Sequence, residues 1–212
     1  MKNARKGFAL IEVAVSLAII VVILSSLVQV NRSTMSTFAQ TSAATLVHTQ
    51  ARRALDRIAS ELENGGLATL QPNPVINSTD NIVFQAATGV DATTGAIVYG
   101  SPTRLAWVLE PGELNNGVDD NGNGLVDDGE LVLTRNYLQA DQQTIVLAHG
   151  VSKLLEGETA NNADDNGNGL IDEHGFCVFR EGNLLRVRLT LLRSVKGKVV
   201  KATVETGVRM RN

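Results

Sequence analysis

An uninterrupted apolar run near the N-terminus constrains this 212-residue chain more than any other feature. From Phe8 to Val30 there are 23 residues that carry one charged side chain, Glu12. That length is sufficient for a helix to cross the hydrocarbon core of a bilayer. A carboxylate deep in hydrocarbon costs roughly 2.5–3.5 kcal/mol on insertion scales, so an isolated anchor would avoid it. We therefore expect the side chain of Glu12 to have a partner.

A short basic leader, with Lys2, Arg5 and Lys6, precedes the apolar run. A secretory signal peptide has an apolar region of about 7–15 residues and then a small-residue cleavage site. Here the run is longer, and the one plausible processing point, between Gly7 and Phe8, comes before it. Cleavage there would leave the whole anchor on the mature chain. The positive leader also predicts a cytoplasmic N-terminus and a globular part outside the inner membrane.

The segment Lys6–Val13, which reads KGFALIEV, resembles the N-terminal signal of type IV pilins and type II secretion pseudopilins. The resemblance implies that a prepilin peptidase cleaves after Gly7 and methylates the new N-terminal Phe8. It also implies that Glu12 pairs with the free amine of a neighbouring subunit in a helical filament. The alternative is a plain signal anchor in which Glu12 is incidental.

Helical patterning continues beyond the apolar run, because no Pro or Gly intervenes before Gly65. Apolar residues recur there at helical spacing, namely at Val47, Ala51, Ala54, Leu55, Ile58 and Leu62. We expect a leader at residues 1–7 and one helix from about Phe8 to Glu63. Its residues 8–30 would cross the membrane, and residues 31–64 would be an amphipathic continuation packed on a globular domain. Major pilins usually carry a Pro in the first half of this helix, so its absence favours a minor component.

From residue 71 onward the pattern becomes that of an antiparallel sheet. Alternation predicts strands at residues 81–85, 96–99, 104–109, 131–135, 185–191 and 200–211. Residues 144–155 read as a strand, or as a short helix leading into one. The last two strands, joined through residues 194–197, predict a hairpin with one buried face. The expected class is α+β, with the long helix packed on an antiparallel sheet in a head of residues 71–212. The pilin resemblance implies a ladle shape.

Three further segments resemble the J-type minor pseudopilins and the W-type minor pilins. They are Ala51–Ala59, Val146–Val151 and Glu205–Asn212. The resemblance implies a place near the tip of a filament and a role in starting its assembly.

Two acidic segments, loop 1 (residues 115–130) and loop 2 (residues 161–175), repeat at a spacing of 45 residues. Loop 1 follows the twelve-residue pattern of an EF-hand calcium loop, although no helix is evident on either side. Its predicted ligands are Asp119, Asn121, Asn123, the carbonyl of Leu125, Asp127 and Glu130, with Val126 as an inward apolar residue. Loop 2 has Gly175 at the twelfth position and would use Asp164, Asn166, Asn168, Leu170, Asp172 and Glu173.

Charge supports a cation in these loops. Their predicted binding segments hold nine acids and no base. The chain has a net charge of −3, and removal of the leader's three positive charges leaves −6 on the mature chain. The nine acids of the two segments contribute −9, so the mature chain outside these segments has a net charge of +3. All the offered ligands are oxygens, which favours Ca²⁺ over zinc, and the ligand number favours it over magnesium. The alternative is that the Asn-Gly and Asp-Gly steps are simply turns between strands.

No catalytic constellation stands out, since His48, His149 and His174 belong to no nucleophile motif, and we expect a non-enzymatic protein. The single cysteine, Cys177, has no internal disulfide partner and is expected to be buried. Basic residues gather in the C-terminal hairpin, but no aromatic residues interleave with them, so nucleic acid is not the expected partner.

The leading interpretation is a minor pseudopilin or minor pilin with a calcium-stabilised head. It would be a single-pass inner-membrane protein with a periplasmic head, and it would help to initiate or cap a type II secretion pseudopilus or a type IV pilus. Its partners would be other pilin subunits, a prepilin peptidase and the membrane. The alternatives are a pilus-tip receptor or adhesin for DNA or a surface, and a membrane-anchored calcium-binding domain that does not polymerise.

Overall fold

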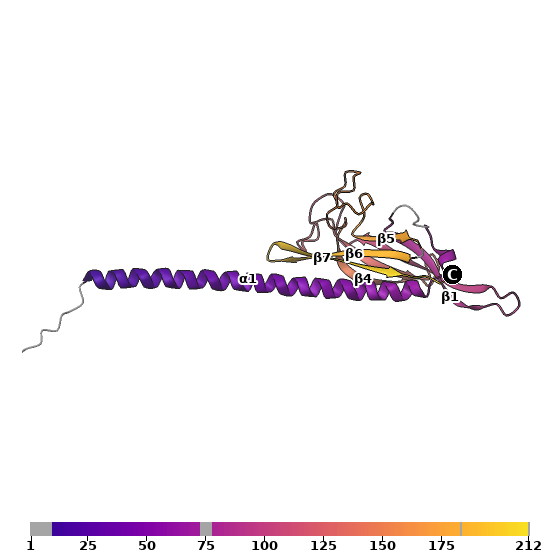
Figure 1. Ribbon diagram of the computed structural model, residues 1–212, viewed down its shortest axis with the longest axis horizontal. Helices are drawn as coiled ribbons and strands as arrows, with labels where there is room; N and C mark the ends of the chain where they lie inside the picture. Colours follow the sequence, from indigo (N-terminus) through magenta and orange to yellow (C-terminus); the bar gives the residue numbers. More distant parts are fainter. Residues whose placement is uncertain (1–9, 73–77, 183, 212) are drawn as a thin grey trace, which may run out of the picture. The chain divides into compact units, whose positions relative to one another are not determined.

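The computed structural model describes residues 10–72, 78–182 and 184–211. In these residues it has one long helix, α1 (Leu10–Glu63), and a single turn of 3-10 helix, η1 (Leu67–Thr69). The strands, drawn in Figure 1, are β1 (Asn81–Val90), β2 (Ile97–Leu109), β3 (Gly129–Arg135), β4 (Gln143–Val151), β5 (Phe176–Glu181), β6 (Leu184–Val195) and β7 (Lys198–Val208). The chain divides into two compact units, at residues 1–42 and 43–212.

The described part of the first unit is the N-terminal portion of α1. The large apolar side chains from Leu10 to Val30 are all exposed there. Within the described residues, α1 is the one helix long and apolar enough to cross a membrane. The predicted end of the helix at Glu63 is confirmed, whereas the predicted start at Phe8 lies outside the described residues.

One antiparallel sheet forms most of the second unit. Its strands follow the order β1-β2-β3-β4-β6-β5, and β7 pairs with β6 along the whole hairpin. The β6–β7 turn is made by Lys196 and Gly197, which have φ angles of 52° and 73°. Two left-handed residues match the twist of a two-residue hairpin. The predicted C-terminal hairpin is therefore confirmed, as is the α+β class.

The prediction of two strands at residues 96–99 and 104–109 is wrong, because β2 runs unbroken through Pro102. β2 pairs with β3 only from Arg104 onward, so the missing N–H of Pro102 breaks no ladder bond with β3, and the carbonyl of Pro102 accepts the N–H of Tyr137 at 2.8 Å. β1 accommodates the irregularity by a register shift between Gln85 and Ala87. Residues 143–151 form a strand and not a helix, and β5 is a strand that the sequence pattern did not predict.

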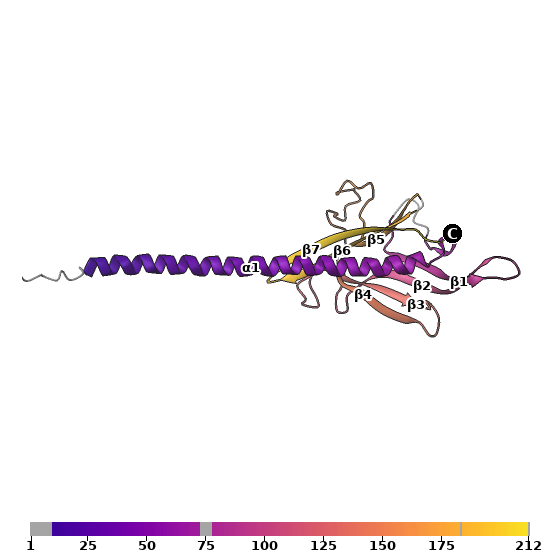
Figure 2. The same cartoon turned by 60° about the horizontal axis from the view of Figure 1, so that its bottom comes forward.

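The core lies between the sheet and residues 43–63 of α1, which follow one face of the sheet in Figure 2. The whole predicted apolar stripe of this segment is buried, together with Ala43. Its partners in the sheet include Ile82, Phe84, Leu105, Leu131, Leu133, Val187 and Leu189. Each large side chain buried in this way contributes roughly 1.5–3 kcal/mol. Cys177 is also buried, as predicted, and burial raises the pKa of its thiol to about 12.

The segment that leaves α1 is tied to the segment that follows β7. The N–H of Leu67 donates to the carbonyl of Arg211 at 2.8 Å, and the N–H of Arg211 donates to the carbonyl of Gly65 at 3.1 Å. A Cβ at Gly65 would lie 2.8 Å from Cδ2 of the buried Phe84 ring and 2.7 Å from Cε of Met210, so a larger residue here would force the packed ring to shift. These hydrogen bonds therefore join the start of the head, at residues 65–67, to its end, at residues 210–211.

Candidate functional site

The processing residues of the N-terminal signal, Gly7 and Phe8, lie outside the described residues. Glu12 falls in the first turn of the described helix, on an exposed surface. Around it, Leu10, Ile11 and Val13 are between 51% and 89% exposed. A surface of this size and apolarity is unfavourable in water, and a membrane or neighbouring apolar helices would cover it.

The two acidic loops have the same internal hydrogen bonds. In loop 1 the carboxylate of Asp119 accepts the N–H groups of Gly122 and Gly124 at 2.7 and 2.8 Å. In loop 2 the bonds 45 positions later, from Gly167 and Gly169 to Asp164, are again 2.7 and 2.8 Å. The repeated sequence therefore produces a repeated backbone.

The predicted asparagine ligands also occupy matching places. In loop 1 the side-chain oxygens of Asn121 and Asn123 each accept the N–H two residues later, at 2.9 and 2.8 Å. The matching distances for Asn166 and Asn168 are 3.0 and 2.9 Å. In each loop, the structure thus places the first, third and fifth ligand positions on a single tight turn.

The ninth positions, Asp127 and Asp172, face the start of their own loops. Asp127 accepts the N–H groups of residues 116 and 117 at 3.0 and 2.9 Å, and Asp172 accepts those of residues 161 and 162 at 3.1 and 2.9 Å. Asp127 also contacts Nζ of Lys153 at 2.8 Å. The hydrogen bond from Lys153, followed by that from Gly117, lowers the pKa of Asp127. Both aspartates therefore close their loops.

The apolar residue of loop 1 that turns inward is Leu125, which is 6% exposed, and the prediction for Val126, which is 52% exposed, is wrong. The backbone of Leu125 continues the tight turn set by the residues before it, and this aims its side chain at the sheet. There Cδ1 of Leu125 would lie 3.4 Å from a Cβ built on Gly150.

The tenth position of each loop carries a fully buried acid, Asp128 or Glu173. The amide of Asn123 donates to Asp128 at 3.2 Å, and that of Asn168 donates to Glu173 at 2.6 Å. Burial, reinforced by the neighbouring Glu110, raises the pKa of Asp128 to about 7. Glu173 contacts Nη1 of Arg188 at 3.4 Å through one oxygen.

Two further acids, Glu113 and Glu158, lie six residues before Asp119 and Asp164, which are the first ligand positions of loops 1 and 2. The Oε1 atom of Glu113 accepts the N–H of Asn121 at 2.9 Å, and that of Glu158 accepts the N–H of Asn166 at 3.2 Å. Their Oε2 atoms are buried without a hydrogen-bond partner, as is Oε2 of Glu173. Sequence reasoning missed both residues, although the 45-residue repeat extends to them.

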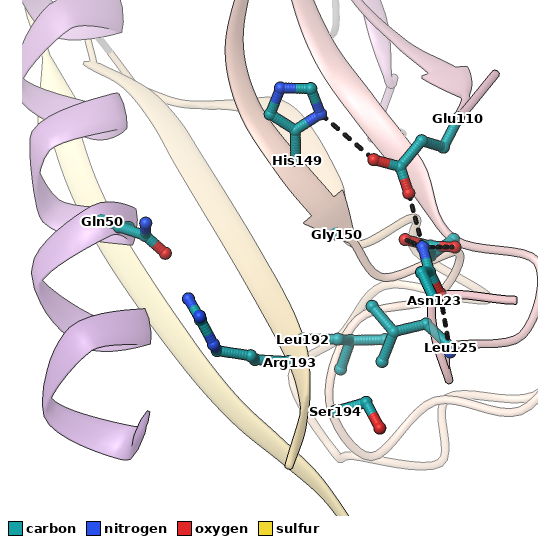
Figure 3. A pocket seen from close by; sticks show the side chains of 10 residues that line it. Gln50, Glu110, Asn123, Leu125, His149, Gly150, Leu192, Arg193 and Ser194 are labelled. Carbon is teal, nitrogen blue, oxygen red and sulfur yellow. Dashed lines mark hydrogen bonds and ion pairs between the residues drawn. The ribbon is translucent and has the colours of Figure 1, made fainter. Parts of the chain in front are cut away.

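Glu130, the predicted twelfth ligand of loop 1, belongs to β3 and contacts His149. Its Oε1 lies 2.9 Å from Nδ1 of His149, and Oε1 of Glu110 lies 3.1 Å from the same nitrogen. Glu110 then accepts the amide of Asn123 at 2.7 Å. Figure 3 shows this succession from His149 through Glu110 to Asn123.

The donor set of the two turns fits a hard cation. Every candidate ligand is a carboxylate, amide or backbone oxygen, which is the ligand type that Ca²⁺ prefers. A buried carboxylate oxygen without a donor is costly, and here such atoms occur on Glu113 and Glu173, next to the tight turns. A cation would satisfy these oxygens.

Three basic residues of the C-terminal hairpin form ion pairs with acids of the same head. Arg186 contacts Glu181 at 2.7 Å, and Nε of Arg188 contacts Glu205 at 2.8 Å. Lys201 contacts a glutamate of the loop before β5 at 3.1 Å. These pairs leave less positive charge for a nucleic-acid backbone than the sequence suggests.

The comparisons with known proteins bear on the N-terminal segment. A family model described as "Prokaryotic N-terminal methylation motif" matches residues 2–28, which include Gly7, Phe8 and Glu12. No curated protein and no solved structure matches the chain. The motif implies processing by a prepilin peptidase and assembly with other pilin subunits, and it agrees with single-pass anchoring of α1 in the inner membrane. The match covers the N-terminal segment alone, where the chain is similar to type IV pilins and pseudopilins, and it points to a structural subunit.

Proposed function

We propose that this chain is a minor pseudopilin or minor pilin that helps to initiate or cap a type II secretion pseudopilus or a type IV pilus. The observation that carries the proposal is the methylation motif at residues 2–28, continuing into a helix whose apolar side chains are exposed as far as Val30. α1 has no proline between Leu10 and Glu63, which favours a minor component over a major pilin.

Glu12 is the residue that would couple the anchor to assembly. In hydrocarbon its carboxylate costs roughly 2.5–3.5 kcal/mol, and a neighbouring subunit's N-terminal amine would offset that cost. An anchor that serves only to hold the head in a membrane has no use for such a group.

Assembly in the native host tests this role. Glu12→Ala is expected to lower recovery of the chain in sheared filament fractions, or secretion of the cargo, at least tenfold at equal expression. Glu63→Ala, at an exposed acid of the same helix, is the matched control and should leave recovery unchanged. Unchanged assembly in Glu12→Ala would exclude the pairing role. An intact Gly7–Phe8 bond in the mature protein, read by mass spectrometry, would favour an anchored domain that does not polymerise.

Calcium in the head is the second part of the proposal. In each loop the ion would take the side-chain oxygens of the first, third and fifth positions and the carbonyl of the seventh. Buried carboxylates would complete the shell. The set for loop 1 is Asp119, Asn121, Asn123, Leu125 and Glu113, and the set for loop 2 is Asp164, Asn166, Asn168, Leu170, Glu158 and Glu173. Calcium would then fix the surface that the head offers to other subunits or to cargo.

A calorimetric titration of the full chain in detergent, with thermal melts in parallel, tests calcium binding. We expect about two ions to bind, with Asp119→Asn removing one site and Asp164→Asn the other. At one hundred times the dissociation constant each ion stabilises the fold by about 2.7 kcal/mol. Glu63→Gln is the control and should bind both ions. An absence of binding at millimolar calcium would leave the loops as acidic turns.

A further inference from the structure

Three metal-ligand side chains outside the two turns converge at the ends of adjacent strands. Glu110 follows β2 directly, Glu130 is the second residue of β3, and His149 lies near the end of β4. β3 pairs with both neighbours, and its register against β4 shifts on either side of Leu131. This irregularity brings His149 to the same end of the neighbouring strands as the two glutamates.

The ligand atoms of these three residues lie within 4.8 Å of one another, and no other such group of three His, Cys, Asp or Glu occurs in the described part of the chain. The two closest approaches, from Nδ1 of His149 to Glu130 and to Glu110, are 2.9 and 3.1 Å. Ligands at the corners of a zinc tetrahedron are about 3.3 Å apart, so an ion fits among these atoms with small side-chain movements.

The charge at this edge is unbalanced. The Nδ1 atom of His149 can donate at most one N–H to these two carboxylates, and neither Glu110 nor Glu130 forms an ion pair with lysine or arginine among the described residues. The side chains of Glu110 and Glu130 are only 17% and 10% exposed, so water screens them poorly. The side chain of His149 is 65% exposed, which leaves solvent a route to the cluster.

We propose that Glu110, Glu130 and His149 bind a divalent transition-metal ion of the zinc, manganese or cobalt class. An imidazole with two carboxylates suits these ions, whereas calcium takes oxygen ligands. The site is distinct from the proposed calcium turns, and it assigns Glu130 to this cluster and not to loop 1.

A pocket of about 320 Å³ borders the cluster and leaves room for further ligands on the ion. Glu110, Asn123 and His149 line one side of it in Figure 3, and Gln50 and Arg193 line the other. Three protein ligands and an open side are the arrangement in which a metal keeps water or an exchangeable ligand. Asn123 donates to Glu110 at 2.7 Å and so orients this ligand from loop 1.

Cobalt absorbance on the full chain, without a polyhistidine tag and in detergent after chelator treatment, tests the site. We expect one Co²⁺ per chain in the presence of excess calcium, displaced by stoichiometric Zn²⁺. His149→Ala should weaken cobalt binding at least tenfold, and Glu110→Gln should change the visible spectrum. His48→Ala, at an exposed histidine of α1, is the control and should bind cobalt like the parent chain.

The result is separable from that for the calcium turns. Asp119→Asn and Asp164→Asn should each lose one calcium site and retain the cobalt spectrum. Equal cobalt binding in His149→Ala with an unchanged melting temperature, no cobalt binding in the parent chain, or displacement of cobalt by equimolar calcium would each overturn the assignment.

Discussion

Loops 1 and 2 share a backbone but differ in what surrounds it. Loop 1 is seated on the sheet: Leu125 is buried, and a Cβ at Gly124 would meet the side chain of Ser194 in β6. In loop 2 Leu170 is half-buried, and a Cβ at Gly169 would meet nothing within 4 Å. The repeated motif therefore specifies the turn, while the neighbouring strands decide how firmly each turn is held.

The loops also differ in how their buried acids are balanced. The protein supplies Arg188 to Glu173 in loop 2, whereas Asp128 in loop 1 faces another acid, Glu110. Loop 1 relies on a proton or a metal ion for this balance. Four predictions test the comparison.

The largest effect is expected from Arg188→Met. It removes the cation beside the buried Glu173 and should lower the free energy of unfolding by about 3–5 kcal/mol without calcium. Chemical denaturation measures it. Arg186→Met removes more exposed pairs and should lower the free energy of unfolding less than Arg188→Met does. Equal losses in the free energy of unfolding for the two variants would show that Arg188 does not stabilise the charged carboxylate of Glu173.

A smaller loss is expected from alanine at the matched glycines. Gly124 and Gly169 have φ angles of 84° and 88°, so alanine at either costs about 1–2 kcal/mol. Only Gly124→Ala also meets Cβ of Ser194, at 2.7 Å, which adds about 1–3 kcal/mol. Thermal melts should therefore place Gly124→Ala below Gly169→Ala. Adding Ser194→Gly to Gly124→Ala should raise its melting temperature to that of Gly169→Ala. A persistent difference would argue against the contact of loop 1 with Ser194.

A pH-dependent effect is expected at Asp128. Its folded pKa of about 7 lies above the unfolded value of about 3.9, so the folded state holds the extra proton between these values. Stability of the metal-free chain should therefore fall as pH rises from about 4 to 7. Asp128→Asn should flatten this part of the profile of melting temperature against pH. An unchanged slope would place the titrating group elsewhere.

The smallest effect is expected from Lys153→Met, which removes the partly exposed pair with Asp127 and should cost under about 1 kcal/mol. Hydrogen exchange is the sensitive measurement here. The amides of Asn116 and Gly117 should exchange faster, while those of residues 161 and 162 keep the parent rates. Faster exchange in both loops would indicate a global loss of stability instead.

Local patterns in the sequence predicted much of the fold. The helix end at Glu63, its buried stripe and the β6–β7 hairpin follow from helical spacing, strand alternation and turn residues. β5 was missed because its run from Phe176 to Phe179 is apolar without alternation. The sequence pattern predicts a break at Pro102 because it does not reveal where the pairing of β2 with β3 ends.

The candidate sites divide along the same line. The turns of both loops are formed by hydrogen bonds between residues a few positions apart, so the local sequence pattern predicts them. Glu113 and Glu158 stand outside the twelve-residue pattern, so only the longer repeat relates them to it. The cluster of Glu110, Glu130 and His149 depends on the register of three strands, which no local pattern encodes.

The tie between residues 65–67 and 210–211 has a consequence for biosynthesis. Synthesis proceeds from the N-terminus, so α1 is complete long before Arg211 is added. The buried stripe of α1 needs β6 and β7 to cover it, and these are made last. The apolar anchor can therefore reach the membrane while the head is still unfolded, and the head can close only after β7 and Arg211 have been translated.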